Sequence, residues 1–505
     1  MTLTQLEKQE KKIGKELYDY QLGAIDKLFD YINKNPDNYN LLYQLPTGGG
    51  KTVIFSEIAR RYINTTKKKV LILTHRIELS KQTSHMLTEF GVHNKIIDSN
   101  VKEVSTNNDY SCYVAMVETL NNRIKDEKVD INDIGLVIVD EAHYNSFRKL
   151  FKYFESCFIL GVTATPLSSN ISLPMHEIYN DLIVGENISS LIEKGFLAEA
   201  TTYSFNVNLT SLKIGMNGDY TVKSSEELYV KNDMQTKLLS AYKQEALGTK
   251  TLIFNNGINT SRHVHETFLR AGYKAKYIDN TNTKEERKSI LKWFKETPDA
   301  ILTSVGILTT GFDEPTIETI IINRATKSLA LYFQMIGRGS RIIKNKKTFK
   351  ILDLGNNLSR FGLWTSDIDW MHIFKNPSLY LENLLSDEEI ESNFTYVMPE
   401  ELRKKFSKSE EIGFNIKKAY AEIIKTGQKS KAVLLQSMMQ HAKMCSENSE
   451  DVFDAHILSR ELDEDIAYRI KQYSYCILKS SNNYIKWLEE DYKRQLRVKI
   501  SQEFY

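Results

Sequence analysis

The sequence predicts an α/β protein with two parallel sheets in tandem, followed by a mainly helical C-terminal region. Three observations lead to this prediction. Short apolar runs alternate with amphipathic helical stretches, which is typical of parallel sheets covered by helices on both faces. The alternation pauses near residue 185 and resumes near residue 251. Residues 375–505 show helical periodicity and contain no proline after Pro399.

Size and composition are those of an ordinary globular protein. The 505 residues suffice for two to four domains, and contents of 41% hydrophobic and 26% charged residues are typical. We expect the domain boundaries to give regions 1–190, 191–250, 251–374 and 375–505. No apolar run approaches the ~18 residues of a membrane span, and the N-terminus lacks a signal peptide's apolar core. The sequence therefore predicts a cytoplasmic protein with no membrane contact.

Cysteine spacing and charge limit the possible partners. The four cysteines are widely scattered, so neither a zinc site nor a disulfide framework is expected. The 67 Lys and Arg residues nearly cancel the 65 Asp and Glu residues, which leaves a net charge of +2. Overall charge does not indicate a polyanionic partner, so any nucleic-acid surface must be a local patch.

The first α/β region is expected to begin with helical residues 1–35. A helix should follow at residues 53–62, and another should open at residues 75–79. Strands are predicted at residues 41–43, 70–74, 113–117, 136–139 and 158–162.

A connector at residues 185–250 is expected to hold a helix through Ile192, a strand near 201–205, a turn at 217–219 and a helix ending near Ala246. The second α/β region should hold helices at 260–271 and 283–294. Its strands are predicted at residues 251–254, 274–278, 300–303, 319–322 and 349–352.

A glycine-rich segment between a strand-like run and a helix predicts a phosphate-binding loop. It reads Leu45-Pro46-Thr47-Gly48-Gly49-Gly50-Lys51-Thr52. Three glycines let the backbone N–H groups converge on one anion, and the following helix adds its positive end. Lys51 is expected to reach the β- and γ-phosphates, and Thr52 to offer its hydroxyl to Mg²⁺. The strict pattern has glycine in place of Leu45, and a surface turn is the alternative.

Two carboxylates follow the apolar strand at 136–139, in the segment Asp140-Glu141-Ala142-His143. Carboxylates at the end of a buried strand need a nearby cation. Beside a phosphate loop that cation is Mg²⁺, held by Asp140 through water, while Glu141 polarises the water that attacks the γ-phosphate. The alternative is that both carboxylates cap the next helix.

Other polar residues have weaker signals. The amide of Gln21 could bind an adenine edge or face solvent. The hydroxyls of Thr163 and Thr165 could link the acidic pair to a second ligand. Arg338 and Arg341 are three residues apart in an expected helix and would share one face. Beside a nucleotide site they would act as arginine fingers on the γ-phosphate, and otherwise they would form a solvated basic face.

Taken in order, these segments resemble the superfamily 2 helicases and translocases, in the DEAH-box group that includes the type III restriction subunits, RadD and UvsW. The resemblance covers about residues 17–360. The matching segments are Gln21, Lys51-Thr52, His75-Arg76-Ile77-Glu78-Leu79, 140–143, 163–165, Phe254, Thr310-Gly311-Phe312-Asp313, 334–341 and 353–362.

The resemblance implies two RecA-like domains with ATP and Mg²⁺ in their cleft and a nucleic-acid strand across both. It places Glu141, Gln334, Arg338 and Arg341 in catalysis. It implies nucleotide contacts for Gly311 and Asp313, besides Gln21 and residues Thr47 to Thr52. It assigns coupling of ATP to domain closure to His143, Thr163 and Thr165. Contacts with the strand's phosphates are implied for Arg76, Thr119, Ser304 and Thr310. The cysteine-rich element of RadD has no counterpart here.

The expected function is that of an ATP-dependent DNA helicase or translocase acting on single-stranded, duplex or branched DNA. An RNA helicase and a partner-dependent ATPase subunit of a restriction, defence or repair assembly are the alternatives. Basic residues are interleaved with aromatic residues in region 375–505, which is compatible with nucleic-acid contact, with a protein partner or with a structural role as solvated faces of packed helices.

Overall fold

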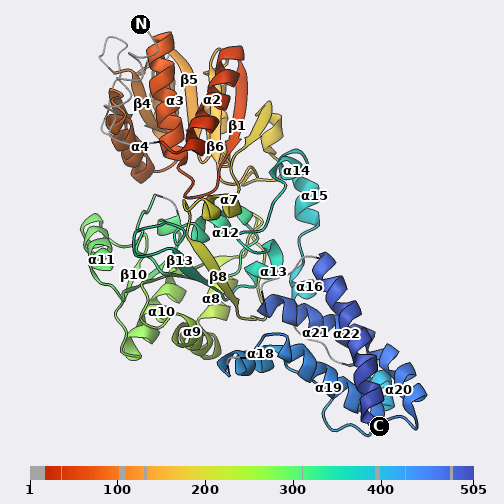
Figure 1. The fold of residues 1–505 in the computed structure, drawn as a ribbon. Coiled ribbons are helices and arrows are strands. Elements are labelled where there is room, and N and C mark those ends of the chain that lie inside the picture. Colours follow the sequence, from red (N-terminus) through yellow and green to blue (C-terminus); the bar gives the residue numbers. More distant parts are fainter. Residues whose placement is uncertain are drawn as a thin grey trace. The chain divides into compact units, whose positions relative to one another are not determined.

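The computed structural model describes residues 17–35, 37–99, 101, 110–129, 133–309, 311–392, 398–426, 428–477 and 482–504. The chain divides into two compact units, whose boundary in the sequence is between Leu384 and Leu385. The N-terminal unit contains two parallel sheets, and the described part of the C-terminal unit is helical (Figure 1).

The first sheet has seven strands in the order β3-β4-β2-β5-β6-β1-β7, and every neighbouring pair is parallel. Its strands are β1 (Tyr39–Gln44), β2 (Lys69–Thr74), β3 (Asn94–Ile97), β4 (Cys112–Met116), β5 (Ile134–Asp140), β6 (Phe158–Thr163) and β7 (Asp181–Val184). All five strands expected in this region are confirmed. The two edge strands, β3 and β7, were not predicted, because both are four residues long and partly polar.

Helices cover both faces of this sheet (Figure 1). Successive side chains of one strand enter different cores: Leu41 and Tyr43 pack on one face and Leu42 on the other. The helices are α2 (Asp19–Lys34), α3 (Lys51–Thr66), α4 (Ile77–Glu89), α5 (Val117–Lys125), α6 (Arg148–Phe151) and α7 (Ile188–Glu193). The helix expected at residues 1–35 is present over the range of α2, whereas residues 1–16 lie outside the described residues.

The second sheet has six parallel strands in the order β10-β11-β9-β12-β13-β8. They are β8 (Glu199–Ser204), β9 (Thr251–Asn255), β10 (Ala275–Ile278), β11 (Ile301–Ser304), β12 (Thr319–Asn323) and β13 (Thr348–Asp353). The five strands expected between residues 251 and 352 are confirmed. The strand expected in the connector is also present, as β8, and it completes the second sheet beside β13.

The remaining helices of the N-terminal unit include α10 and α11, both close to expectation. The set is α8 (Val222–Tyr229), α9 (Asn232–Glu245), α10 (Ile258–Arg270), α11 (Lys284–Glu296), α12 (Leu329–Ile336), α13 (Asn357–Phe361), α14 (Trp370–Lys375) and α15 (Pro377–Glu382). One hydrophobic cluster contains Val139 of the first sheet, Ile320 of the second, and Leu197 from the chain between them. The two sheets thus share a core within this unit.

The C-terminal unit has its own apolar core. Its helices are α16 (Asp387–Ser392), α17 (Glu400–Lys405), α18 (Ile416–Lys425), α19 (Ala432–Glu447), α20 (Val452–Ser459), α21 (Asp463–Cys476) and α22 (Asn482–Glu503). Among the described helices of the whole chain, no segment has the length and apolar character of a membrane span.

A buried polar network joins three helices of the C-terminal unit. The Nε2 of His441 lies 2.9 Å from Asp465 Oδ2, and its Nδ1 lies 3.0 Å from the Tyr492 hydroxyl. The Arg469 guanidinium donates two hydrogen bonds to the same carboxylate. Burial, with a smaller effect of Arg469, lowers the pKa of His441 to about 4. The imidazole is therefore neutral in the folded protein near neutral pH.

This network predicts an acid-sensitive C-terminal unit. Below pH 6.5 the unfolded chain protonates His441 while the folded chain does not, so stability falls as pH decreases toward the folded pKa of about 4. We expect a loss of about 2 kcal/mol between pH 7 and 5. Hydrogen exchange of α19 peptides in the full chain, corrected for intrinsic rates, measures it. His441→Gln should weaken this pH dependence, and an unchanged dependence would assign it to other groups.

Candidate functional site: a nucleotide cleft between the two sheets

The phosphate loop connects the end of β1 to the first residue of α3, as the sequence predicted. Gly48 and Gly50 have φ values of 92° and 85°, in the left-handed region that favours glycine. A Cβ at Gly48 would lie 2.7 Å from Arg341 Nη1, and one at Gly50 would lie 2.5 Å from Gln21 Nε2. A Cβ at Gly49 would lie 2.8 Å from Leu45. The loop is thus closely surrounded, and its geometry suits a phosphate cradle.

Lys51 and Thr52 are the first two residues of α3. The Lys51 ammonium donates a long hydrogen bond of 3.4 Å to the Leu45 carbonyl oxygen. Burial lowers the pKa of Lys51, while Glu141 and Asp140 oppose this effect. The Thr47 hydroxyl is buried and has no hydrogen-bond partner among the described residues. The loop therefore presents a cation and an unpaired hydroxyl.

The acidic pair lies at the end of strand β5, which is separated from β1 by β6. Asp140 Oδ1 accepts a hydrogen bond from the Glu141 backbone N–H at 3.0 Å. Burial and the charge of Glu141 raise the pKa of Asp140 to about 7. Burial raises the pKa of Glu141. The electrostatic effects of Lys51, His143, His75 and Arg338 together exceed the effect of burial and lower this pKa overall. The Glu141 Oε2 atom is buried and accepts no hydrogen bond from the described residues.

These groups fit a magnesium–triphosphate complex. Mg²⁺ is commonly bound by one or two carboxylates together with substrate phosphates. An unpaired buried carboxylate oxygen, a half-buried lysine and a glycine cradle supply the protein's part of such a site.

His143, Thr163 and Thr165 are joined by hydrogen bonds, and their role in coupling stays a prediction. The Thr163 hydroxyl donates to the Thr165 carbonyl oxygen at 3.1 Å, so it accepts from His143 Nδ1 at 3.0 Å. The opposite nitrogen of His143 lies 3.4 Å from the side-chain amide of Gln334. Because Gln334 is on α12, this contact connects the acidic segment with the second sheet.

The expected helix through Arg338 and Arg341 is wrong. Helix α12 ends at Ile336, and the chain turns through Gly337 and Gly339, so the two arginines do not share a helical face. Glycine ends helices readily, which explains the early stop.

The two arginines have different surroundings. The Arg338 guanidinium is 8% exposed and donates to the carbonyl oxygens of Thr309 (3.1 and 2.6 Å) and Phe312 (2.6 Å). The Arg341 guanidinium donates to Asp313 at 3.0 Å and lies against Gly48 of the phosphate loop. Arg341 is therefore the arginine of the second sheet that reaches the cradle.

A buried lysine holds this arginine's backbone. The Lys346 ammonium donates to the carbonyl oxygens of Gly339 and Arg341 at 2.5 and 2.8 Å. Burial lowers the pKa of Lys346 to about 8. Sequence reasoning missed this residue, because nothing local distinguishes it from the other lysines of segment 344–347.

Gln21 is buried rather than exposed to solvent. Its Oε1 accepts from the Tyr18 backbone N–H at 3.0 Å, and its amide group lies against Gly50. The Tyr20 hydroxyl donates to the Gly49 carbonyl oxygen at 2.8 Å, and burial raises its pKa to about 12. The rings of Tyr18 and Tyr20 both contact Phe196. This aromatic group beside the loop was not predicted; the Tyr-Asp-Tyr-Gln segment was its only sequence signal.

Among the remaining nucleotide residues, Gly311 is not at the phosphate loop. A Cβ at Gly311 would lie 3.3 Å from Glu78, and its carbonyl oxygen accepts from Gln82 at 2.8 Å, so it faces α4. Asp313 forms an ion pair with Arg341, which lies against the phosphate loop.

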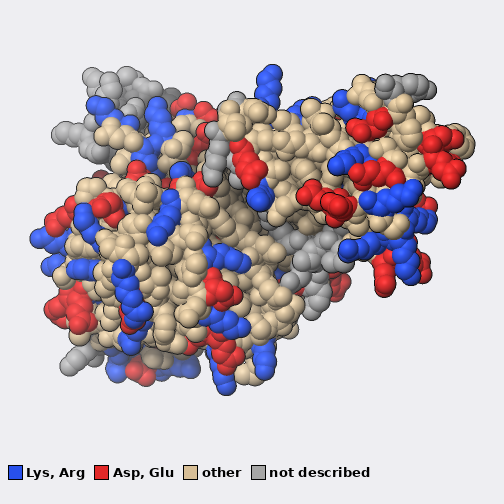
Figure 2. Space-filling model, turned by 90° about the horizontal axis from the view of Figure 1, so that it is seen from below, with Lys and Arg blue, Asp and Glu red and all other residues tan. Residues whose placement is uncertain are grey.

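Lys and Arg residues are interspersed with Asp and Glu on the face seen in Figure 2, in agreement with a nearly neutral chain. One local candidate for a strand contact is a pocket of about 290 Å³, called the Arg76 pocket below. It is lined by Arg76, Val222, Asn256, Gly257, Ile258, Asn280, Val305, Gly306 and Ile307. The Arg76 guanidinium donates to the carbonyl oxygens of Gly306 and Ile307 at 3.5 and 3.3 Å.

The other residues expected to contact a strand are placed differently. Ser304 is fully buried at the end of β11, so its side chain is not available to a ligand; residues 305–307 line the pocket instead. Thr119 is half-buried on α5 and does not line the pocket. Thr310 lies outside the described residues.

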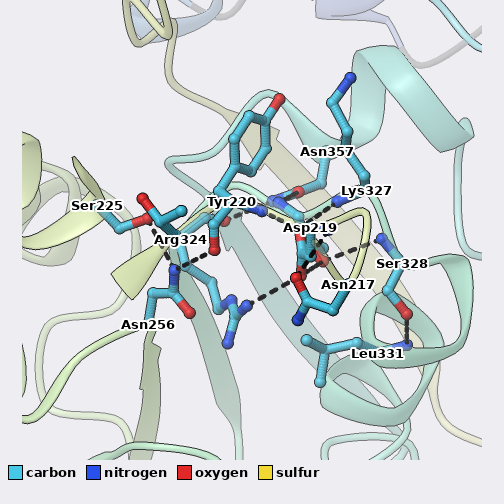
Figure 3. A network of polar contacts seen from close by, with 12 residues as sticks. Asn217, Asp219, Tyr220, Ser225, Asn256, Arg324, Lys327, Ser328, Leu331 and Asn357 are labelled. Atoms are coloured by element: carbon cyan, nitrogen blue, oxygen red, sulfur yellow. Dashed lines mark hydrogen bonds and ion pairs between the residues drawn. The ribbon is translucent and has the colours of Figure 1, made fainter. Parts of the chain in front are cut away.

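A polar network adjoins the Arg76 pocket, because Asn256 of the pocket lining donates to the Tyr220 carbonyl oxygen and the Ser225 hydroxyl (Figure 3). Asp219, the last residue of the turn between Ile214 and Tyr220, accepts hydrogen bonds from the Thr326 hydroxyl (2.7 Å) and the Lys327 backbone N–H (2.8 Å). It also pairs with the buried Arg324 at 3.3 Å. Helix α8 begins shortly after this turn, and its first residue, Val222, lines the pocket.

Loss of this anchor should destabilise the second sheet and its pocket. Asp219→Ala leaves Arg324 buried without its carboxylate, and we expect the free energy of unfolding to fall by about 3 kcal/mol. Urea denaturation measures this change, with the exposed Asp367→Ala as the matched control. Equal stability of the two variants would contradict an anchoring role.

Comparison with known proteins adds to this geometry. Residues 14–168 match the family model of the type III restriction enzyme res subunit, and residues 230–343 match that of the helicase conserved C-terminal domain. IRC3 of Saccharomyces cerevisiae, named as an ATP-dependent helicase, is 30% identical over 67% of this chain and 51% of its own length. The chain thus spans about half of that relative.

Two solved structures share the fold. An HsdR subunit fragment of a type I restriction enzyme from Vibrio vulnificus has a TM-score of 0.55 at 22% identity, over 70% of this chain and 66% of that one. The ATP-dependent Type ISP restriction-modification enzyme LlaBIII, solved bound to DNA, has a TM-score of 0.52 at 12% identity, over 97% of this chain and 42% of that one. With its two RecA-like domains and both family matches, the chain belongs to the superfamily 2 helicases, in the group related to the type III restriction subunit.

Proposed function

We propose that this helicase-family protein is a DNA translocase or helicase that hydrolyses ATP in the cleft between its two sheets. The observation that carries the proposal is the approach of Arg341, from the second sheet, to Gly48 of the phosphate loop on the first. A nucleotide in the loop would meet charged groups from both domains, so its hydrolysis can change how the domains hold each other.

In this proposal each residue has a separate task. The loop N–H groups and Lys51 bind the triphosphate, and Gln21 and Tyr20 fix the loop's entrance. Glu141 orients and polarises the attacking water. Arg341 stabilises charge that develops on the γ-phosphate. Mg²⁺, held by Thr52 and by Asp140 through water, would neutralise phosphate charge when bound.

Arg338 has a supporting task in this proposal. Its hydrogen bonds to the carbonyl oxygens of Thr309 and Phe312 hold the loop that carries Asp313, the partner of Arg341. Gln334 of the second domain contacts His143 of the first at 3.4 Å, so a change of the bound nucleotide that moves one of these residues would also move the other. We assign direct transition-state contact to Arg341 alone of the two arginines.

The proposed track is a nucleic-acid strand in the Arg76 pocket. The N-terminus of α10, at Ile258, opens into this pocket, and a helix N-terminus attracts phosphate groups. Because Arg76 belongs to the first domain and the remaining lining to the second, closure and opening of the cleft would change the grip on the strand.

DNA is favoured over RNA by the likeness to LlaBIII, which extends over 97% of this chain and whose structure contains DNA. RNA remains the alternative, because a phage DNA helicase and a yeast RNA helicase are both among the relatives. A partner-dependent ATPase subunit is a second candidate function. It is supported by the likeness to an HsdR subunit, whose name marks it as one part of a larger enzyme.

ATP hydrolysis should depend on Lys51 and respond to DNA. We expect Lys51→Ala to reduce turnover to background, and the exposed Lys27→Ala to leave it unchanged. The measurement is the steady-state ATPase rate without polymer and with single-stranded, duplex and branched DNA and single-stranded RNA at matched salt. Equal stimulation by matched DNA and RNA strands would contradict DNA preference. Absence of stimulation by every polymer would favour the partner-dependent subunit.

The two arginines should separate into a structural and a catalytic class. Arg341→Ala is expected to lower hydrolysis by roughly 10³-fold while leaving nucleotide binding largely intact. Arg338→Ala should instead lower the free energy of unfolding by about 3 kcal/mol, because it removes a buried charge-assisted network. Titration with a fluorescent nucleotide, single-turnover hydrolysis and urea denaturation distinguish them. Identical effects of both variants would contradict this division.

A further inference from the structure

Tyr144 lies between the imidazole rings of His75 and His143, and the mechanism above gives it no role. Its ring centroid is 4.3 Å from that of each histidine, and the planes are tilted by 36° in both contacts. The three rings form a continuous column, called the aromatic stack below. His75 and Tyr144 come from different segments of the first domain, so the column crosses the end of the first sheet.

One end of the stack reaches the nucleotide site. His143 contacts Thr163 and Gln334, and its Nδ1 lies 3.5 Å from Glu141 Oε2. Movement of the Tyr144 ring therefore displaces groups that touch the carboxylate proposed to polarise the attacking water.

The other end reaches the Arg76 pocket. His75 is followed directly by Arg76, whose guanidinium donates to the carbonyl oxygens of Gly306 and Ile307. All three of these residues line the pocket. A strand phosphate in the pocket would compete with the two carbonyl oxygens for Arg76, because a guanidinium binds phosphate strongly. His75 then moves with the shared backbone.

Ring contacts, rather than hydrogen bonds, hold His75. Both of its ring nitrogens are buried and have no hydrogen-bond partner among the described residues. Burial lowers its pKa to about 4, so the ring is neutral near pH 7. Offset aromatic contacts tolerate small changes in ring position better than directional hydrogen bonds do. The His75 ring can therefore follow its loop and push or release Tyr144.

We propose that Tyr144 is a positioning residue that transmits occupancy of the Arg76 pocket to Glu141, and so sets how strongly a bound strand accelerates ATP hydrolysis. The inference rests on the proposed function, because it requires a strand in the pocket. Tyr144 acts through His75 on one side and through His143 on the other, and it contacts neither strand nor nucleotide itself.

The test compares Tyr144→Leu and Tyr144→Phe in the full chain. The matched control is Tyr277→Leu, which removes a half-buried tyrosine ring 5.2 Å from His265 in the second domain. His75→Leu interrupts the stack from its other end and serves if Tyr144→Leu does not fold, which circular dichroism checks. ATPase rate and ATP KM are measured with and without saturating single-stranded DNA. Fluorescence anisotropy of labelled DNA gives its Kd.

We expect Tyr144→Leu and His75→Leu to lower the DNA-stimulated kcat by about 10-fold, a typical size for coupling between two sites. The rate without DNA, the KM for ATP and the DNA Kd should each stay within about 2-fold of the unmodified protein, since the stack carries coupling and not binding. Tyr144→Phe keeps the ring and should keep the stimulation, and Tyr277→Leu should behave as the unmodified protein does.

Three results would overturn the inference. Full stimulation of Tyr144→Leu would remove the coupling role and leave the proposed function intact. A parallel fall of the basal and stimulated rates would make Tyr144 a merely structural residue. If no polymer stimulates the unmodified protein, the proposed function fails first and the inference fails with it.

Discussion

The structure depends on placing opposite charges together inside the protein, where strands β1 and β5 end. Asp140 and Glu141 are buried, and their charges oppose the lowering of the pKa of the half-buried Lys51. Removal of charged groups from water costs several kcal/mol per ion. Attraction between the charged groups offsets this cost only when the groups are held in a favourable, fixed geometry. The parallel sheet supplies it, because the carboxyl ends of its strands meet at one edge and are clamped by cores on both faces.

The second sheet completes this arrangement instead of repeating it. It contributes no phosphate loop, but it supplies Arg341, whose guanidinium lies against Gly48, and Gln334, whose side chain contacts His143. Each of these contacts joins two residues that are far apart in the sequence. A ligand that binds beside the phosphate loop could therefore alter these polar contacts.

Local sequence patterns predicted the elements that have local causes. Gly48 to Gly50 predicted the cradle, because only glycine adopts its φ values easily, and the apolar run before Asp140 predicted a buried strand that ends in acids. The edge strands β3 and β7 lacked such a signal, since short polar strands resemble loops. The helix through Arg338 was extrapolated past Gly337 and Gly339, where the structure turns. The aromatic stack and the Lys346 contacts arise from packing between distant segments, which no local pattern encodes.

The position of β8 has a consequence for how this protein can be divided. This strand precedes β9 in the chain, yet it lies at an edge of the second sheet, beside β13 and separated from β9 by β12 and β13. The sheet is therefore closed by a segment that leaves the first domain, and its last ladder joins residues about as far apart as Ser204 and Asp353. A fragment that starts at residue 251 would leave the β13 edge bare, with a row of unpaired N–H and C=O groups open to other chains. The second domain thus depends on residues 199–204, which precede it in the chain, to pair with the edge of its sheet.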